Sequence, residues 1–213
     1  MTAIPLKPQH GPTLGRLLEP RWRVARPLTR ALVTIAGVLV ALLLIVAVLS
    51  LLDASYSHGG HTPFGFRYRG LYRTTPDPGG YVKVARHSAE GGIEDSFAVA
   101  PLRLPPYAGS VTGELPLRAA AYVHELRRRF AGFRLQGEGK TRITSTLAGY
   151  DVRYSALVEG RRLSGRDVIL MPKATHPQAG VVLEMLTSEY ASVAKPVATQ
   201  GVLEKPLKTF SFG

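Results

Sequence analysis

Two histidines that flank a glycine pair are the strongest candidate for metal chemistry in this chain. His58 and His61 enclose Gly59 and Gly60, and two closely spaced imidazoles can bind zinc or a related ion. A metal site also needs further ligands and fixed ring orientations, and the nearby sequence offers neither. We therefore predict a flexible linker here, with no metal ligand and no bound cofactor.

Two further motifs have residues that could contact phosphate. The segment Gly137-Glu138-Gly139-Lys140-Thr141 resembles the end of a phosphate-binding loop, but that loop requires a glycine where Arg134 stands. We predict a hairpin turn instead. The run Arg127-Arg128-Arg129 could grip a phosphate or a carboxylate, yet its place on a predicted helix favours a solvated face.

Local motifs predict no catalytic residue. The sequence has no cysteine, which excludes a thiolate nucleophile, and Ser110 does not occupy the centre of a nucleophile-elbow pattern. Glu94 and Asp95 are adjacent, so on a strand their side chains point to opposite faces and do not form an acid–base pair. A site assembled from distant residues stays open, with candidates Asp151, Arg153, His124 and Glu184.

An uncharged apolar stretch covers residues 31–52, and fifteen of these 22 residues are Leu, Val or Ile. As a helix it spans ~33 Å, against ~30 Å for the hydrocarbon core of a bilayer. A helix in a soluble core is rarely apolar on every face for six turns. A cleaved signal peptide has a shorter apolar region that ends at a small-residue site. The stretch therefore predicts an uncleaved transmembrane signal anchor.

The charges that flank this stretch predict its orientation. Six basic residues and one acidic residue precede it, whereas Asp53 follows it directly and the next basic residue is Arg67. Because basic flanks stay on the cytoplasmic side, we expect residues 1–30 to form a cytoplasmic tail and the C-terminal part to lie outside the cell membrane. The tail places four arginines where they can contact anionic lipid headgroups, namely Arg21, Arg23, Arg26 and Arg30.

Residues 64–213 have the patterns of an extracytoplasmic α+β domain, and residues 53–63 form a short polar linker before it. An amphipathic helix is predicted to begin at Pro116 and to end at Gly132. Its buried face contains Ala119, Tyr122, Val123, Leu126 and Phe130. Alternation and apolar runs predict strands at 81–86, 96–102, 150–158, 167–171 and 180–186. Further helices are predicted at 188–195 and 202–208.

Part of this domain resembles the PsbP-like fold. The resemblance rests on the stretch from Thr146 to Tyr150 with the alternating strand after it, on the strand Gly180–Leu186, and on the ending Val202–Phe212. This group includes photosystem extrinsic proteins and small bacterial envelope domains. The resemblance implies an antiparallel sheet between helices, and it implies no catalytic residues because the group shares none.

The distribution of charge limits the expected partners. The chain has a net charge of +12, but residues 53–213 carry 21 basic and 14 acidic residues that are interspersed. This pattern does not favour nucleic acid. We expect a non-enzymatic binding or interaction module, with the lipid bilayer and either an envelope protein or an anionic polymer as partners. The alternatives are a subunit of a larger membrane complex and an envelope enzyme whose site the sequence does not reveal.

Overall fold

The computed structural model describes residues 27–103, 111–144, 147–171, 179–192 and 194–213. The chain divides into two compact units, Met1–Leu51 and Leu52–Gly213, and each is described by itself. An apolar helix precedes antiparallel sheets and further helices, which confirms the predicted α+β class. Between the strands predicted at 167–171 and 180–186, residues 172–178 lie outside the described residues.

Helix α2 (Pro27–Leu51) contains the apolar stretch. It begins at a proline. Proline lacks a backbone N–H and is tolerated at the first helical position, because an N–H there would have no intrahelical partner. The segment Ala31–Val48 has a mean hydropathy of 3.1, and none of it is buried within the protein. Among the described residues, α2 is the one helix long and apolar enough to cross a membrane.

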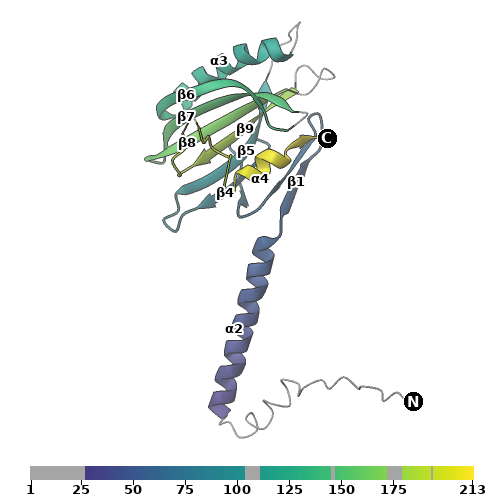
Figure 1. The fold of residues 1–213 in the computed structure, drawn as a ribbon, viewed down its shortest axis with the longest axis vertical. Coiled ribbons are helices and arrows are strands. Elements are labelled where there is room, and N and C mark those ends of the chain that lie inside the picture. The colour runs from purple at the N-terminus through teal and green to yellow at the C-terminus, as the bar shows by residue number, and fades with distance from the viewer. Residues whose placement is uncertain (1–26, 104–110, 145–146, 172–178, 193) are drawn as a thin grey trace, which may run out of the picture. The chain divides into compact units, whose positions relative to one another are not determined.

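The second unit is built on a seven-stranded antiparallel sheet (Figure 1). Each of the five predicted strands is present. Both faces of the sheet are covered, so apolar residues along a strand can pack against the core on one face or the other. Strand β9 is an example, since Val181 and Leu183 belong to one core while Val182 between them belongs to the other. In sheet order the strands are β3 (Tyr72–Thr74), β4 (Val82–His87), β5 (Ile93–Arg103), β9 (Ala179–Thr187), β8 (Arg161–Leu170), β7 (Ala148–Val158) and β6 (Ala131–Arg142).

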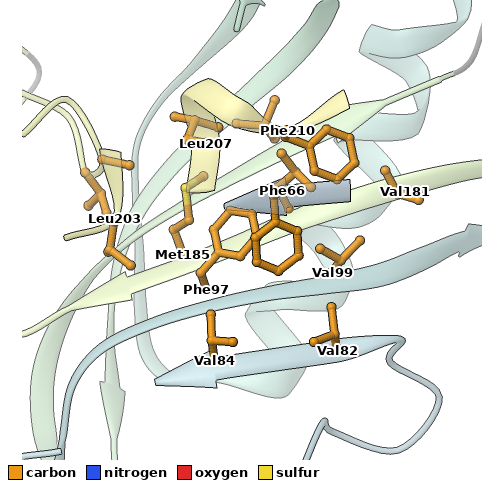
Figure 2. Close-up of a cluster of buried hydrophobic side chains, with 14 of the residues drawn as sticks. Phe66, Val82, Val84, Phe97, Val99, Val181, Met185, Leu203, Leu207 and Phe210 are labelled. Atoms are coloured by element: carbon orange, nitrogen blue, oxygen red, sulfur yellow. The ribbon is translucent and has the colours of Figure 1, made fainter. Parts of the chain in front are cut away.

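One face of this sheet is covered by a small second sheet and by the C-terminal segment. The small sheet has the order β1 (Ala54–His58), β2 (Phe64–Tyr68) and β10 (Ser211–Phe212), and α4 (Glu204–Thr209) packs on β2. Phe66, Phe97 and Phe210 meet in the core between these layers (Figure 2). Strand β1 lies within residues 53–63, so the prediction of a plain linker there is wrong. Pairing with β2 orders this segment.

The other face is covered by α3 (Val111–Arg129), which contacts β6 and β7 (Figure 1). The predicted buried face is confirmed, since Ala119 and Leu126 are fully buried, Tyr122 and Val123 are nearly so, and Phe130 packs against this core just after the helix ends. The predicted start is wrong, because the helix begins five residues before Pro116. Pro116 is the sixth residue of the helix, so it removes one intrahelical hydrogen bond, and the helix continues through it. Glu114 and Arg118 form an ion pair at the four-residue spacing that places side chains next to each other on a helix.

Two other local predictions differ from the structure. The segment Gly137–Thr141 is not a hairpin turn, because it lies inside edge strand β6 and pairs with β7. The described part of residues 188–195 is not helical, whereas the helix predicted at 202–208 is present as α4. The antiparallel sheet between helices that the PsbP-like resemblance implied is observed.

Candidate functional site: a polar cluster beside an open cleft

Because α3 covers the sheet near β6 and β7, a cleft of about 650 Å³ remains between α3 and β5. Its floor is shallow and apolar because β5 presents Ala98 and Ala100 on the face toward α3. One wall comes from α3, and the loop 76–80 between β3 and β4 forms the opposite rim. The polar lining residues are Asp77, Tyr122, Glu125, Arg129 and Glu184.

A buried hydrogen-bonded cluster lies at the α3 side of this cleft. The hydroxyl of Tyr122 is 2.9 Å from Oδ2 of Asp167 and 3.0 Å from Oε1 of Glu184. The hydroxyl of Tyr154 is 3.3 Å from both carboxyl oxygens of Asp167. Asp167 has no exposed surface. Asp167 and Glu184 are directly paired across β8 and β9, so the sheet register brings the two acids together.

Counting hydrogens indicates which acid keeps its proton. A tyrosine hydroxyl has one hydrogen to donate, and an ionised carboxylate has none. Tyr122 lies within hydrogen-bond distance of both acids but can donate to only one. If Asp167 is protonated, it donates to Tyr122, Tyr122 donates to Glu184, and Tyr154 donates to Asp167. Every contact is then a donor–acceptor pair. Because Glu184 is bound by the Arg129 guanidinium at 2.6 Å and stays ionised, Asp167 is the acid that keeps the proton.

The electrostatic environment of the cluster agrees with this assignment. Burial raises the pKa of Asp167 well above its usual range, and the charge of Glu184 raises it further. The contacts with Tyr122 and Tyr154 and the charge of Arg129 oppose the shift without offsetting it. Burial also raises the pKa of both tyrosines, with the Asp167 carboxyl as the next cause. The tyrosines are therefore neutral hydrogen-bond donors.

Arg129 links this buried cluster to the rim of the cleft. Its guanidinium nitrogens lie 2.6 Å from Oε1 of Glu184 and 2.8 Å from Oδ2 of Asp77. Asp77 is also bound by Lys83, at 3.0 Å. Burial would lower the pKa of Arg129, but its hydrogen bond to Glu184 raises that pKa above the ordinary value. Arg127, Arg128 and Arg129 are all exposed, as expected for a solvated helix face, and Arg129 in addition binds the two carboxylates.

The four residues proposed for a distributed catalytic site do not come together. Asp151 and Arg153 lie on the face of β7 opposite to α3, where Asp151 pairs with Arg166 at 2.6 Å. Glu184 is on the α3 face, and the side chain of His124 is exposed. The sheet thus separates the first two residues from Glu184, because alternate strand residues point to opposite faces.

The remaining predicted site residues have ordinary packing roles or lie outside the described region. His58 ends strand β1, and its ring lies 4.6 Å from the ring of Tyr81 and 5.0 Å from that of Phe64. Within the described residues no group of three or more potential metal ligands occurs. Glu94 and Asp95 both form ion pairs with Arg86, although the side chains of neighbouring strand residues were expected to point to opposite faces. Arg21, Arg23 and Arg26 lie outside the described residues, and Arg30 is in the first turns of α2.

The sequence contains a signal for the buried cluster that pattern reasoning passed over. Asp167 stands before the apolar run Val-Ile-Leu, and Glu184 interrupts the apolar strand Gly180–Leu186. An acid at a core position of a strand must be paired or neutral. Tyr122 was predicted as a buried residue, but its partners come from strands 45 and 62 positions away.

Comparisons with known proteins give weak likenesses in structure. No protein-family model matches the sequence, and no curated protein matches it. The Ran-binding protein Mog1p of Saccharomyces cerevisiae is 9% identical with a TM-score of 0.49, over 76% of this chain and 96% of that chain. LpqN of Mycobacterium tuberculosis, involved in cell envelope biogenesis, is 10% identical with a TM-score of 0.48, over 75% and 91%. No function is transferred from these likenesses.

Proposed function

We propose that this protein is a single-pass membrane protein whose C-terminal domain is a binding module outside the cell. The apolar helix α2 supports the anchor, because so long an uncharged segment is most stable among lipid tails. The excess of basic residues before α2 supports a cytoplasmic N-terminus. The single observation that carries the binding role is the open cleft beside α3.

The charge of the cleft favours a cationic ligand. Its described lining contains three acids, Asp77, Glu125 and Glu184, and one base, Arg129. Lys83 offsets part of the charge of Asp77 from beside the cleft. The lining is therefore acidic within a domain that is basic as a whole. The ligand that fits best is a basic segment of an envelope protein that carries small apolar side chains for the alanine floor.

Binding without catalysis is the simplest role for this arrangement. The neutral Asp167 is sealed from solvent, and its hydrogen bonds are used within the protein. Arg129 and Glu184 satisfy each other at the cleft wall. These groups stabilise the wall of the cleft, and Glu125 on α3 lines the same cleft. Neither nucleic acid nor an anionic polymer suits an acidic cleft, because like charges repel.

The proposal is tested by titrating the full-length protein in detergent with a fluorescent peptide of alternating lysine and alanine. We expect Glu125→Gln to weaken binding about threefold to tenfold, because removing a rim charge reduces electrostatic attraction. Ala98→Trp should abolish binding by filling the apolar floor. The matched control is Glu138→Gln, which removes one exposed acid from β6 away from the cleft.

Equal affinity in all four proteins would overturn the cleft as the binding site. Tighter binding of a peptide of alternating glutamate and alanine would overturn the assignment of a cationic ligand. Far-ultraviolet circular dichroism of the Ala98→Trp variant distinguishes a blocked cleft from an unfolded domain. A native spectrum is expected because Ala98 is partly exposed.

A further inference from the structure

A second hollow, of about 570 Å³, lies at the surface formed by α4 and the end of β2. Its charged lining residues are Arg69, Lys205, Lys208 and one acid, Glu204. The hydroxyl-bearing Thr209 and the small residues Gly201 and Val202 complete the lining. We refer to this set of seven residues as the basic hollow. Its charge is opposite in sign to that of the cleft beside α3.

The basic hollow lies beside Asp53, which follows the end of helix α2 closely in the sequence. Asp53 comes two residues after Leu51, and two residues span at most ~7 Å even when fully extended. Lys205 makes an ion pair with Asp53. Ala54 pairs with Tyr68 across β1 and β2, which brings the residues after Tyr68 beside Asp53. Covalent connection thus tethers the hollow to the end of the apolar helix.

Further basic residues surround this tether point. The hydrogen bond from Lys205, followed by the charges of Lys205, Arg69 and Arg67, holds the pKa of Asp53 below its usual range. Arg67 and Arg69 are exposed because Phe66 and Tyr68, which alternate with them in and beside β2, turn toward the core. Four basic and two acidic residues therefore occupy this surface, and both acids are already bound by its lysines.

We propose that the basic hollow binds the phosphodiester headgroup of an anionic glycerophospholipid in the leaflet from which α2 emerges. The inference rests on the proposed anchor. The headgroup layer of one leaflet is roughly 5–8 Å thick, which matches the reach of the two-residue tether. Lysine and arginine are the usual partners of phosphate oxygens, and Arg69, Lys205 and Lys208 line the hollow. The headgroup fixes the domain against the membrane, and the acidic cleft then receives its ligand at a defined height.

The test uses full-length protein in vesicles and exploits the absence of cysteine from the chain. A nitroxide is attached at Ser55→Cys, an exposed β1 position paired with Arg67. Vesicles contain phosphatidylcholine alone or with phosphatidylglycerol as about a third of the lipid. Paramagnetic resonance then measures how accessible the label is to a neutral nickel chelate in the water. We expect accessibility to be about threefold lower in the anionic vesicles, and salt should remove the difference.

Variants assign the effect to the hollow. Arg69→Gln with Lys208→Gln should abolish the difference between vesicles while leaving the Lys205–Asp53 pair intact. The matched control, Arg127→Gln with Arg128→Gln, removes two exposed charges from α3 and should preserve it. Equal accessibility in the two vesicle types would overturn the inference, as would loss of the effect in the control. Free glycerol phosphate that shields the label equally in neutral vesicles would overturn the assignment to lipid.

Failure of the anchor gives a different result from failure of the hollow. Protein that an alkaline wash strips from both vesicle types overturns the anchor and this inference together. Protein that stays with both types but shows equal label accessibility overturns this inference alone.

Discussion

Replacing Asp167 by asparagine should stabilise the folded domain at neutral pH. Asparagine keeps an acceptor oxygen for Tyr154 and supplies an N–H donor toward Tyr122, as the protonated acid does. Unlike aspartate, it does not titrate. At acidic pH, where Asp167 is protonated in both states, the variant and the wild type should have nearly equal free energies of unfolding.

The difference should grow as the pH rises. In the folded protein Asp167 holds its proton because its pKa is raised by burial and by Glu184. In the unfolded chain an aspartate ionises near pH ~3.9, so the folded state binds more protons above that pH. Stability of the wild type is therefore lost as the pH rises toward the folded-state pKa. One titrating group changes the free energy of unfolding by at most ~1.4 kcal/mol per pH unit. The variant does not lose stability in this way, because asparagine does not titrate.

The assay is urea unfolding of the full chain in detergent from about pH 4 to about pH 8, followed by near-ultraviolet circular dichroism of tyrosine. Tyrosine is a suitable probe because the one tryptophan, Trp22, precedes the domain. Subtracting the free energy of unfolding of the wild type from that of the variant at each pH cancels the contributions of the other titrating groups. A difference that stays constant across this range would refute a neutral Asp167. Asp167→Ala serves as the control. Compared with Asp167→Asn, which also does not titrate, its lost hydrogen bonds should cost ~1–3 kcal/mol at every pH.

Three further changes test the packing and charge around this cluster. Glu184→Gln should narrow the pH range over which the advantage of Asp167→Asn grows, and so lower its final size, because the charge of Glu184 helps to raise the Asp167 pKa; the same pH series measures it. Leu126→Ala should lower the free energy of unfolding by ~2–5 kcal/mol, since this side chain is fully buried. Gly165→Ala should cost ~1–3 kcal/mol, because the added Cβ would lie 2.4 Å from the Tyr154 ring. Gly139→Ala, which meets no atom within 4 Å, is the control for both packing variants in urea titrations.

Periodicity predicted much of the fold because it records local geometry. The apolar stretch of α2, the buried face of α3 and the five strands all follow from side-chain spacing along one segment. Element ends were less certain, as Pro116 shows, because a proline in the second turn of a helix removes one hydrogen bond without ending the helix. Strand β1 was missed because DASYSH is polar, and only pairing with β2 orders it.

The candidate site was harder to predict because it depends on sheet register. Tyr122, Asp167 and Glu184 belong to α3, β8 and β9, and no spacing within one segment relates them. Asp151 and Glu184 were considered together, yet strand alternation places them on opposite faces of the sheet. The basic residues of the hollow were interpreted as part of a surface of mixed charge. Arg69 and Lys205 are far apart in the sequence, and both come to lie near Asp53 only after β1 pairs with β2.

The most direct test of the account is the side of the membrane on which each end of the chain lies. Single cysteines at Thr2 and at Tyr190, which is 90% exposed, can be labelled in intact cells with a maleimide that does not cross membranes. The account predicts labelling of Tyr190→Cys in intact cells and of Thr2→Cys only after permeabilisation. Labelling of Thr2→Cys alone in intact cells, or of neither before permeabilisation, would contradict an extracytoplasmic binding module.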